Sequence, residues 1–146
     1  MKCRIGILAL CLVLLVSMLP LEGALAANVK PSQYQSYYTD TMLVAMNKIG
    51  DSLKTRLTTS TALKNAWNNA KTGFKKLQKA HNKVAVLKKD SKAKSYLSSL
   101  KKNVEEGHKR SKKVAASDTT LMKYQKNVMK YLKKYQARVK KLMKVN

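Results

Sequence analysis

Cysteine is nearly absent from this 146-residue sequence, which contains only Cys3 and Cys11. Both lie in residues 1–26, a segment with a basic start, an apolar run and small residues at its end. These features predict a secretory signal peptide that is cleaved after Ala26. An uncleaved membrane anchor is the alternative, although the apolar run is short for a membrane span. The single domain expected at residues 27–146 would then lack disulfides, which excludes the small cystine-rich toxins and growth factors.

Acidic residues are also scarce. The chain has 31 Lys and Arg against seven Asp and Glu, and Lys2, Arg4 and Glu22 belong to the expected signal peptide. Residues 27–146 therefore keep 29 basic and six acidic residues, a formal net charge of +23. Most of these basic side chains cannot be neutralised within the chain, so we expect a polyanionic partner. Only three of the 29 are arginine, the residue that reads bases, and specific nucleic-acid binding is not expected.

Signals for β-structure are missing as well. No stretch alternates apolar and polar residues as a half-buried strand would, and Pro31 is the only proline after the expected signal peptide. Apolar residues instead recur at alternating spacings of four and three, which is typical of amphipathic helices that pack side by side. The pattern is clearest in residues 62–89, 91–114 and 118–146. Short connections between such segments predict an all-α fold, an elongated up-down bundle of four helices.

Capping residues and glycines mark the expected helix boundaries. Ser32 can begin a first helix that runs to about Ile49, with a kink or short break at Gly50-Asp51-Ser52. Asp90-Ser91 and Ser117-Asp118 are expected to cap the third and the last helix. Gly107 could end the third helix early, which would give five helices, and the sequence leaves both counts open.

The last expected helix has two opposite faces. Its apolar seam consists of Leu121, Gln125, Val128, Leu132, Tyr135, Val139 and Leu142. A lysine series starts two residues later and lies nearly opposite, since successive helical residues are about 100° apart. The lysines are Lys123, Lys126, Lys130, Lys133, Lys140 and Lys144. We expect these six to bind an anionic partner, and Tyr37, Tyr124 and Tyr131 to add apolar contact.

Residue types that carry catalysis are few and scattered. Asp51, Asp90 and Asp118 fall where helices are expected to begin, and Glu105-Glu106 point about 100° apart on one helix. His81 lies on an apolar seam, where a partly buried structural role is expected. Two histidines without cysteine or a well-placed acid make neither a metal site nor a catalytic triad. We therefore expect no enzyme activity, no cofactor and no metal.

A secreted, cysteine-free, strongly cationic helical bundle with aromatic patches resembles the acrosomal proteins of gastropod sperm, the lysins and their fusogenic paralogues. The resemblance is one of architecture: residues 27–146 share the size, helix pattern, basicity and lack of disulfides, and the expected signal peptide precedes them. It implies a non-enzymatic protein released from an acrosomal vesicle or another secretory granule. Lysins open the egg envelope by binding its glycoprotein filaments, and the paralogues act on membranes. The resemblance assigns no role to any single residue.

Three functions remain open at this point. The first is binding and disruption of an anionic extracellular target such as an egg-coat glycoprotein or glycan. The second is permeabilisation of an anionic membrane, fusogenic or antimicrobial, in which residues 121–145 leave the bundle and lie among the lipid headgroups. The third is a structural role in which the protein condenses secreted polyanions. A homodimer is a further expectation, because apolar flanks could meet once salt screens the charge.

Overall fold

The computed structural model describes residues 28–146, and within that range it contains helices and no strand. The expected signal peptide and its cleavage point lie outside the described residues. The first helical run, residues 31–54, consists of η1 (Pro31–Gln33), α2 (Tyr34–Tyr37), the π-helical η2 (Tyr38–Met42) and α3 (Leu43–Lys54). The helices that follow are α4 (Ser60–Asn82), the short α5 (Ala85–Lys89), α6 (Ser91–Ser111) and α7 (Thr119–Met143).

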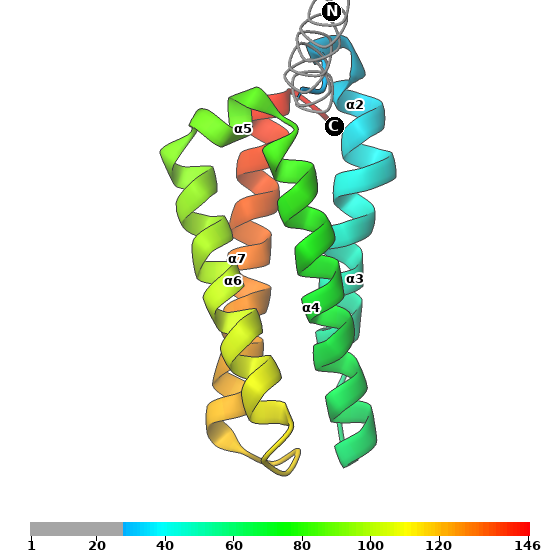
Figure 1. The fold of residues 1–146 in the computed structure, drawn as a ribbon, viewed down its shortest axis with the longest axis vertical. Coiled ribbons are helices and arrows are strands. Elements are labelled where there is room, and N and C mark those ends of the chain that lie inside the picture. The colour runs from blue at the N-terminus through cyan, green and yellow to red at the C-terminus, as the bar shows by residue number, and fades with distance from the viewer. Residues whose placement is uncertain (1–27) are drawn as a thin grey trace, which may run out of the picture.

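The four long helical stretches run alternately down and up the molecule (Figure 1). Helix α3 packs against α4 and α7, and α6 packs against α4 and α7, so the stretches form a closed ring around one core. Helix α7, with 25 residues, is about 37 Å long at 1.5 Å per residue, and the bundle is elongated along it. The predicted all-α up-down bundle is thus confirmed.

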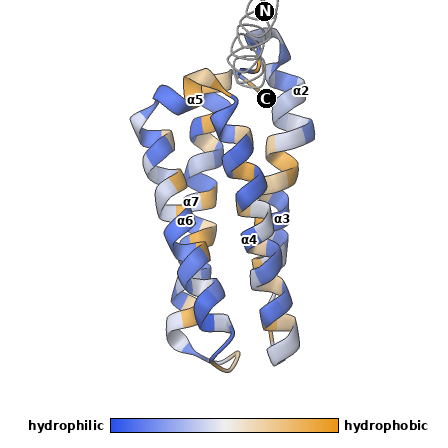
Figure 2. Cartoon of the chain, viewed as in Figure 1, coloured by the Kyte–Doolittle hydropathy of each residue, from blue (hydrophilic) through white to orange (hydrophobic). Residues whose placement is uncertain are grey.

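The four-three spacing of apolar residues builds this core. On α7, Leu121, Val128, Tyr135 and Val139 are almost completely buried, whereas the hydrophilic residues of α4 and α6 face outward (Figure 2). The last buried residue of α7 is Met143 rather than the expected Leu142, which is half-buried. A straight helix has 3.6 residues per turn, so a strict seven-residue repeat drifts by about 20° per heptad and the buried stripe moves to the next residue.

The break expected at Gly50-Asp51-Ser52 is wrong, because α3 continues through it to Lys54. Gly50 is buried, and a Cβ atom there would lie 3.4 Å from the Leu132 side chain. The glycine therefore lies inside α3 where this helix contacts α7, and it does not end the helix. Ser52 begins no new helix either, since its hydroxyl donates a hydrogen bond of 2.6 Å to the Lys48 carbonyl within α3.

The helix expected over residues 62–89 is interrupted. Helix α4 ends at Asn82, and Val84 takes an extended conformation (φ −109°, ψ 104°) before α5 begins. Val84 is completely buried, and the neighbouring Lys83 carbonyl accepts a hydrogen bond of 2.7 Å from the Val29 amide. The bend between α4 and α5 is thus stabilised by packing at the end of the bundle. The sequence has no glycine or proline there that could have indicated it.

Gly107 does not end the third helix, because α6 runs through it to Ser111. A Cβ atom at this position would lie 2.2 Å from two atoms of the Trp67 ring. The missing side chain lets this tryptophan, which is completely buried, pack directly against the α6 backbone. When residues 31–54 are counted as one helix, the described chain has five helices. The additional one is α5, and it arises from the bend at Val84 rather than from Gly107.

Gly107→Ala should destabilise the protein even though alanine is the better helix former. Helix propensity alone would add about 1 kcal/mol to the free energy of unfolding, whereas overpacking a well-filled core costs about 1–3 kcal/mol. Gly50→Ala is the matched control, because its Cβ makes an ordinary contact at 3.4 Å and should be neutral or stabilising. Urea unfolding of both variants measures the difference. Equal or greater stability of Gly107→Ala would contradict this account of the Trp67 contact.

Candidate anion-binding surface

The six predicted lysines lie on α7 or directly after it. Five are exposed, and Lys140 is half-buried. Lys144 lies one residue beyond α7, where it ends the helix in the left-handed conformation (φ 53°, ψ 46°). The remaining five follow the helix surface away from the core, so α7 does carry a lysine row opposite its apolar seam.

The three predicted tyrosines are all partly buried, but they do not form one patch. The Tyr37 hydroxyl donates a hydrogen bond of 3.2 Å to the Ala80 carbonyl, which ties α2 to α4. Tyr124 and Tyr131 pack beside the core from α7. Tyr37 therefore serves the bundle itself, and only the two α7 tyrosines lie next to the lysine row.

A cluster of lysines and tyrosines spans α6 and α7. The ammonium of Lys134 lies 5.9 Å from the centroids of both Tyr131 and Tyr96, and that of Lys130 lies 5.6 Å from the Tyr131 centroid. Cation–π attraction at such distances restrains the lysine side chains over the rings. The contact between Tyr96 and Lys134 was not predictable from the sequence, because it depends on how α6 and α7 are aligned.

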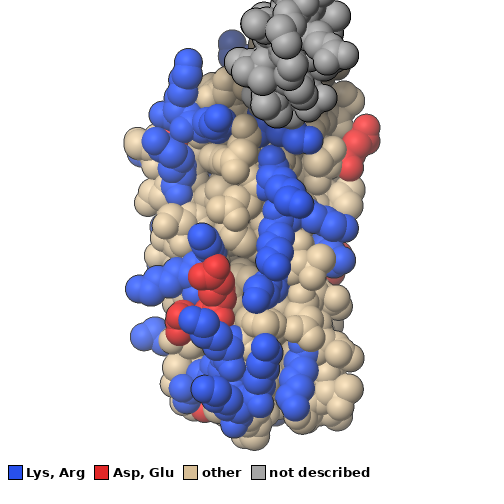
Figure 3. Space-filling model, in the orientation of Figure 1, with Lys and Arg blue, Asp and Glu red and all other residues tan. Residues whose placement is uncertain are grey.

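Lysines also cover other helices. Figure 3 shows basic side chains spread over the face formed by α4 and α6, with few acidic ones between them. His108 of α6 is buried, and its Nε2 lies 2.7 Å from Oδ1 of Asn68 on α4. Burial lowers the pKa of His108, and the charges of Lys71, Lys112 and Lys75 lower it further. The cationic surface is thus broader than the α7 row predicted from the sequence.

Two of the six acidic side chains in residues 27–146 each cap a helix N-terminus and also pair with an arginine of another helix. We call each such aspartate–arginine pair a clamp. Asp90 caps α6 by accepting a hydrogen bond of 2.8 Å from the Ala93 amide. Its carboxylate also accepts bonds of 2.9 and 2.6 Å from Nε and Nη2 of Arg138 on α7. The Arg138 bonds, followed by the backbone bond, lower the pKa of Asp90 to about 2. The cap was predicted from the sequence, but the arginine 48 residues away was not.

The second clamp is built in the same way at the opposite junction. Asp118 caps α7 by accepting from the Leu121 amide at 2.8 Å, and it accepts from Arg110 of α6 at 2.7 and 3.0 Å. These bonds, those from Arg110 first, lower the pKa of Asp118 to about 2. Each clamp therefore joins α6 to α7, one near each end of the pair.

The other acids leave the charge largely unbalanced. Asp51 caps no helix, contrary to expectation, because α3 continues through it, and it forms an exposed pair with Lys54 at 3.7 Å. Glu106 pairs with Lys109, three residues later on α6, at 3.7 Å. Four carboxylates thus engage four basic residues. The other 25 of the 29 have no carboxylate of residues 28–146 within 4.0 Å.

His81 is buried more completely than expected. Its Nδ1 lies 2.8 Å from the Tyr135 hydroxyl, and both side chains belong to the core between α4 and α7. Burial lowers the pKa of His81, and the charges of Lys88 and Lys94 lower it further. Within residues 28–146, no group of three or more His, Cys, Asp or Glu side chains could hold a metal ion. No helix in that range is both long and apolar enough to cross a membrane.

No protein-family model, no curated protein and no solved structure matches this chain. Its function is therefore argued from the surface and the core described above.

Asp90→Asn and Asp118→Asn should each lower the melting temperature at pH 7. Asparagine caps a helix about as well as aspartate, so these variants remove mainly the ion pair with arginine. Because folding depresses both aspartate pKa values from 3.8 to about 2, the clamps stabilise the protein above pH 4 and lose this effect as the pH falls toward 2. In thermal unfolding, the difference in melting temperature between each variant and the wild type should become smaller over that pH range. Asp51→Asn, in an exposed pair, should change little; an equal effect at all three positions would argue against the clamps.

Mild acid should destabilise the protein through its two buried histidines. Both have a folded-state pKa below the ordinary 6.5, so protonation favours the unfolded chain. Stability is then full above pH 6.5 and declines below it, by at most about 1.4 kcal/mol per pH unit for each histidine. His81→Gln, which keeps a polar partner for Tyr135 but does not titrate, should reduce this decline in urea unfolding at pH 7.5 and pH 5. A wild-type stability that stays constant between these two pH values would refute the prediction.

Proposed function

We propose that this is a secreted, non-enzymatic, strongly cationic helical protein that binds and disrupts an anionic extracellular target, an egg-coat glycoprotein or a similar acidic glycan. The observation that carries the proposal is the unbalanced charge: 25 of 29 basic side chains lack a carboxylate partner among residues 28–146. Repulsion between them favours a partner that brings negative charge. The resemblance to gastropod sperm lysins points to the same class of target.

The lysine row on α7 has a spacing that suits a linear polyanion. Lys123, Lys126, Lys130 and Lys133 are exposed along one rigid helix, and neighbours in the row are about 4.5–6 Å apart along its axis. A polyanionic chain lying along α7 would meet these lysines in succession. The Tyr131 ring, half-buried beside Lys130, adds an apolar surface against which a sugar ring or an acyl group can pack.

The ion pairs and hydrogen bonds that hold α7 in the bundle favour this function over membrane permeabilisation, which would require α7 to leave the bundle. Both arginine clamps join α7 to α6. In addition, the side-chain amides of Gln125, Asn127 and Gln136 donate hydrogen bonds to Leu53, Asn103 and Tyr38, respectively. Release of α7 would break these bonds and expose its buried seam to water. We therefore propose that the lysine surface acts with the bundle intact.

The triple variant Lys126→Gln, Lys130→Gln, Lys133→Gln tests the α7 row. Its affinity for a soluble sulfated polysaccharide should drop, and the slope of log K against log salt should become shallower by roughly one per lysine removed. The matched control is Lys64→Gln, Lys75→Gln, Lys76→Gln. These three lysines are exposed on α4, which lies diagonally across the ring from α7. Both triple variants lose the same net charge, and calorimetry over a salt series measures each.

The outcomes separate the three functions. Loss confined to the α7 variant supports the proposed surface. Equal loss in both variants would indicate binding by total charge, as expected for a polyanion-condensing structural protein, and would remove the assignment to α7. Dye release from anionic vesicles at low protein-to-lipid ratios, with no saturable polysaccharide binding, would instead establish the membrane-permeabilising alternative.

A further inference from the structure

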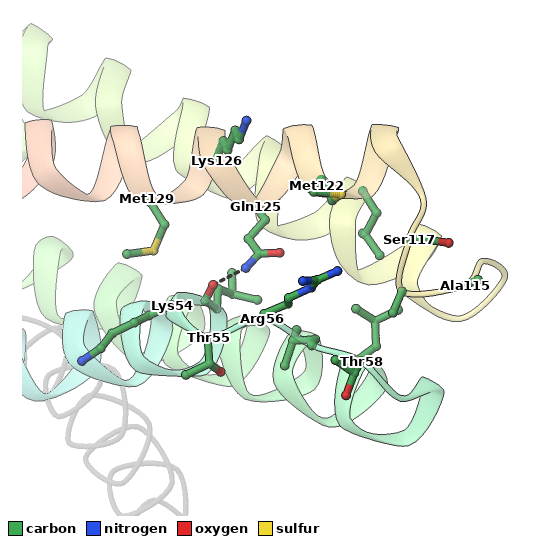
Figure 4. A pocket seen from close by; sticks show the side chains of 15 residues that line it. Lys54, Thr55, Arg56, Thr58, Ala115, Ser117, Met122, Gln125, Lys126 and Met129 are labelled. Atoms are coloured by element: carbon green, nitrogen blue, oxygen red, sulfur yellow. Dashed lines mark hydrogen bonds between the residues drawn. The ribbon is translucent and has the colours of Figure 1, made fainter.

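A pocket opens at the end of the bundle where two connections meet. It has a volume of about 870 Å³ and lies between the segment that follows α3, the segment that precedes α7, and the first turns of α7 (Figure 4). Its large apolar lining residues are Leu53, Leu57, Leu63, Leu121, Met122 and Met129. A concave, mostly apolar site of this size is typical of a small-molecule binding site.

A hydrogen bond between α7 and the end of α3 supports the wall of this pocket, whereas an exposed methionine at its rim can change conformation. The side-chain amide of Gln125 donates a hydrogen bond to the Leu53 carbonyl, which joins α7 to the end of α3 beside the pocket (Figure 4). Met122 on the rim is 47% exposed, one of two large apolar side chains in the described chain that are exposed to this extent. Methionine side chains are flexible and polarisable, so they adjust to apolar ligands of different shape.

Arg56 is the basic side chain that reaches over the pocket. Its side chain extends across the pocket, whereas those of Lys54 and Lys126 point away from it (Figure 4). Of the three arginines in the described residues, Arg110 and Arg138 are bound to aspartates, but Arg56 has no carboxylate of residues 28–146 within 4.0 Å. No acidic side chain lines the pocket either. An unpaired guanidinium above an apolar cavity is complementary to an apolar molecule that ends in a carboxylate or phosphate.

We infer that this pocket binds a single-chain anionic amphiphile, such as a fatty acid. Its hydrocarbon chain lies among the leucines and methionines of the lining, and its headgroup accepts hydrogen bonds from the Arg56 guanidinium. The inference is independent of the polyanion-binding role proposed for α7, because a flexible acyl chain needs a cavity and a glycan needs an exposed surface. The amphiphile can come from solution or, as the acyl chain of an anionic lipid, from a membrane surface.

Isothermal titration with dodecanoate below its micellar concentration tests this site. We expect saturable binding of one molecule per chain and at least tenfold weaker binding to Arg56→Gln. Lys76→Gln, which loses the same charge from an exposed position on α4 outside the pocket, should bind as the wild type does. Dodecyltrimethylammonium, which has the same chain and a positive headgroup, should bind at least tenfold more weakly than dodecanoate. Equal binding of both amphiphiles, or equal loss in both variants, would overturn the inference.

A steric variant and a vesicle assay complete the test. Ala116→Phe places a large side chain on a half-buried position of the pocket wall and should abolish dodecanoate binding while circular dichroism reports an unchanged helix content. Undiminished binding would show that the ligand lies elsewhere and would overturn the proposal. Capture by phosphatidylglycerol vesicles that falls in Arg56→Gln but not in Lys76→Gln would identify the lipid as a source. Dodecanoate binding without such a difference would identify the free acid.

Discussion

Mutual repulsion among the lysines is the constraint on which the rest of the structure depends. A net charge of +23 on residues 27–146 favours any expanded state of the chain, and no disulfide of residues 28–146 opposes it, because that range has no cysteine. Burial of one continuous apolar core must therefore overcome the repulsion. The arrangement follows from this: 26 apolar side chains fill the interior, and the four long helical stretches keep their lysines on the outside, where water and salt screen the charge.

Arginine and lysine are used differently within this arrangement. Arg110 and Arg138 act at the joints between α6 and α7, where the planar guanidinium forms two hydrogen bonds with a helix-capping aspartate. Lysine, a strongly hydrated point charge on a flexible chain, covers the surface. The few acids are thus concentrated at positions where one carboxylate both caps a helix and binds an arginine. Arg56, which has no such partner among the described residues, is the exception, and it lies at the apolar pocket between the α3–α4 and α6–α7 connections.

The periodicity of the sequence predicted the helices and most of the core, because a four-three spacing has few solutions other than packed helices. The caps Asp90 and Asp118 were also predictable, since a cap is a local interaction. The break expected at Gly50 was wrong, whereas the effect of Gly107, which the sequence left open, depends on the close approach of Trp67 that this glycine permits. The bend at Val84, the arginine partners of the caps, the Tyr96–Lys134 contact and the pocket all depend on residues distant in sequence, which periodicity does not relate.

The abundance of lysine on the surface has a consequence for how the protein resists proteolysis. Proteases that cut after basic residues would find 29 possible sites in residues 28–146, but they need an extended segment of several residues, and helices do not offer one. Digestion must then wait for a helix to open. The clamps at the two ends of the α6–α7 pair limit such opening, so the interactions that order the fold also set how long the chain survives proteolysis.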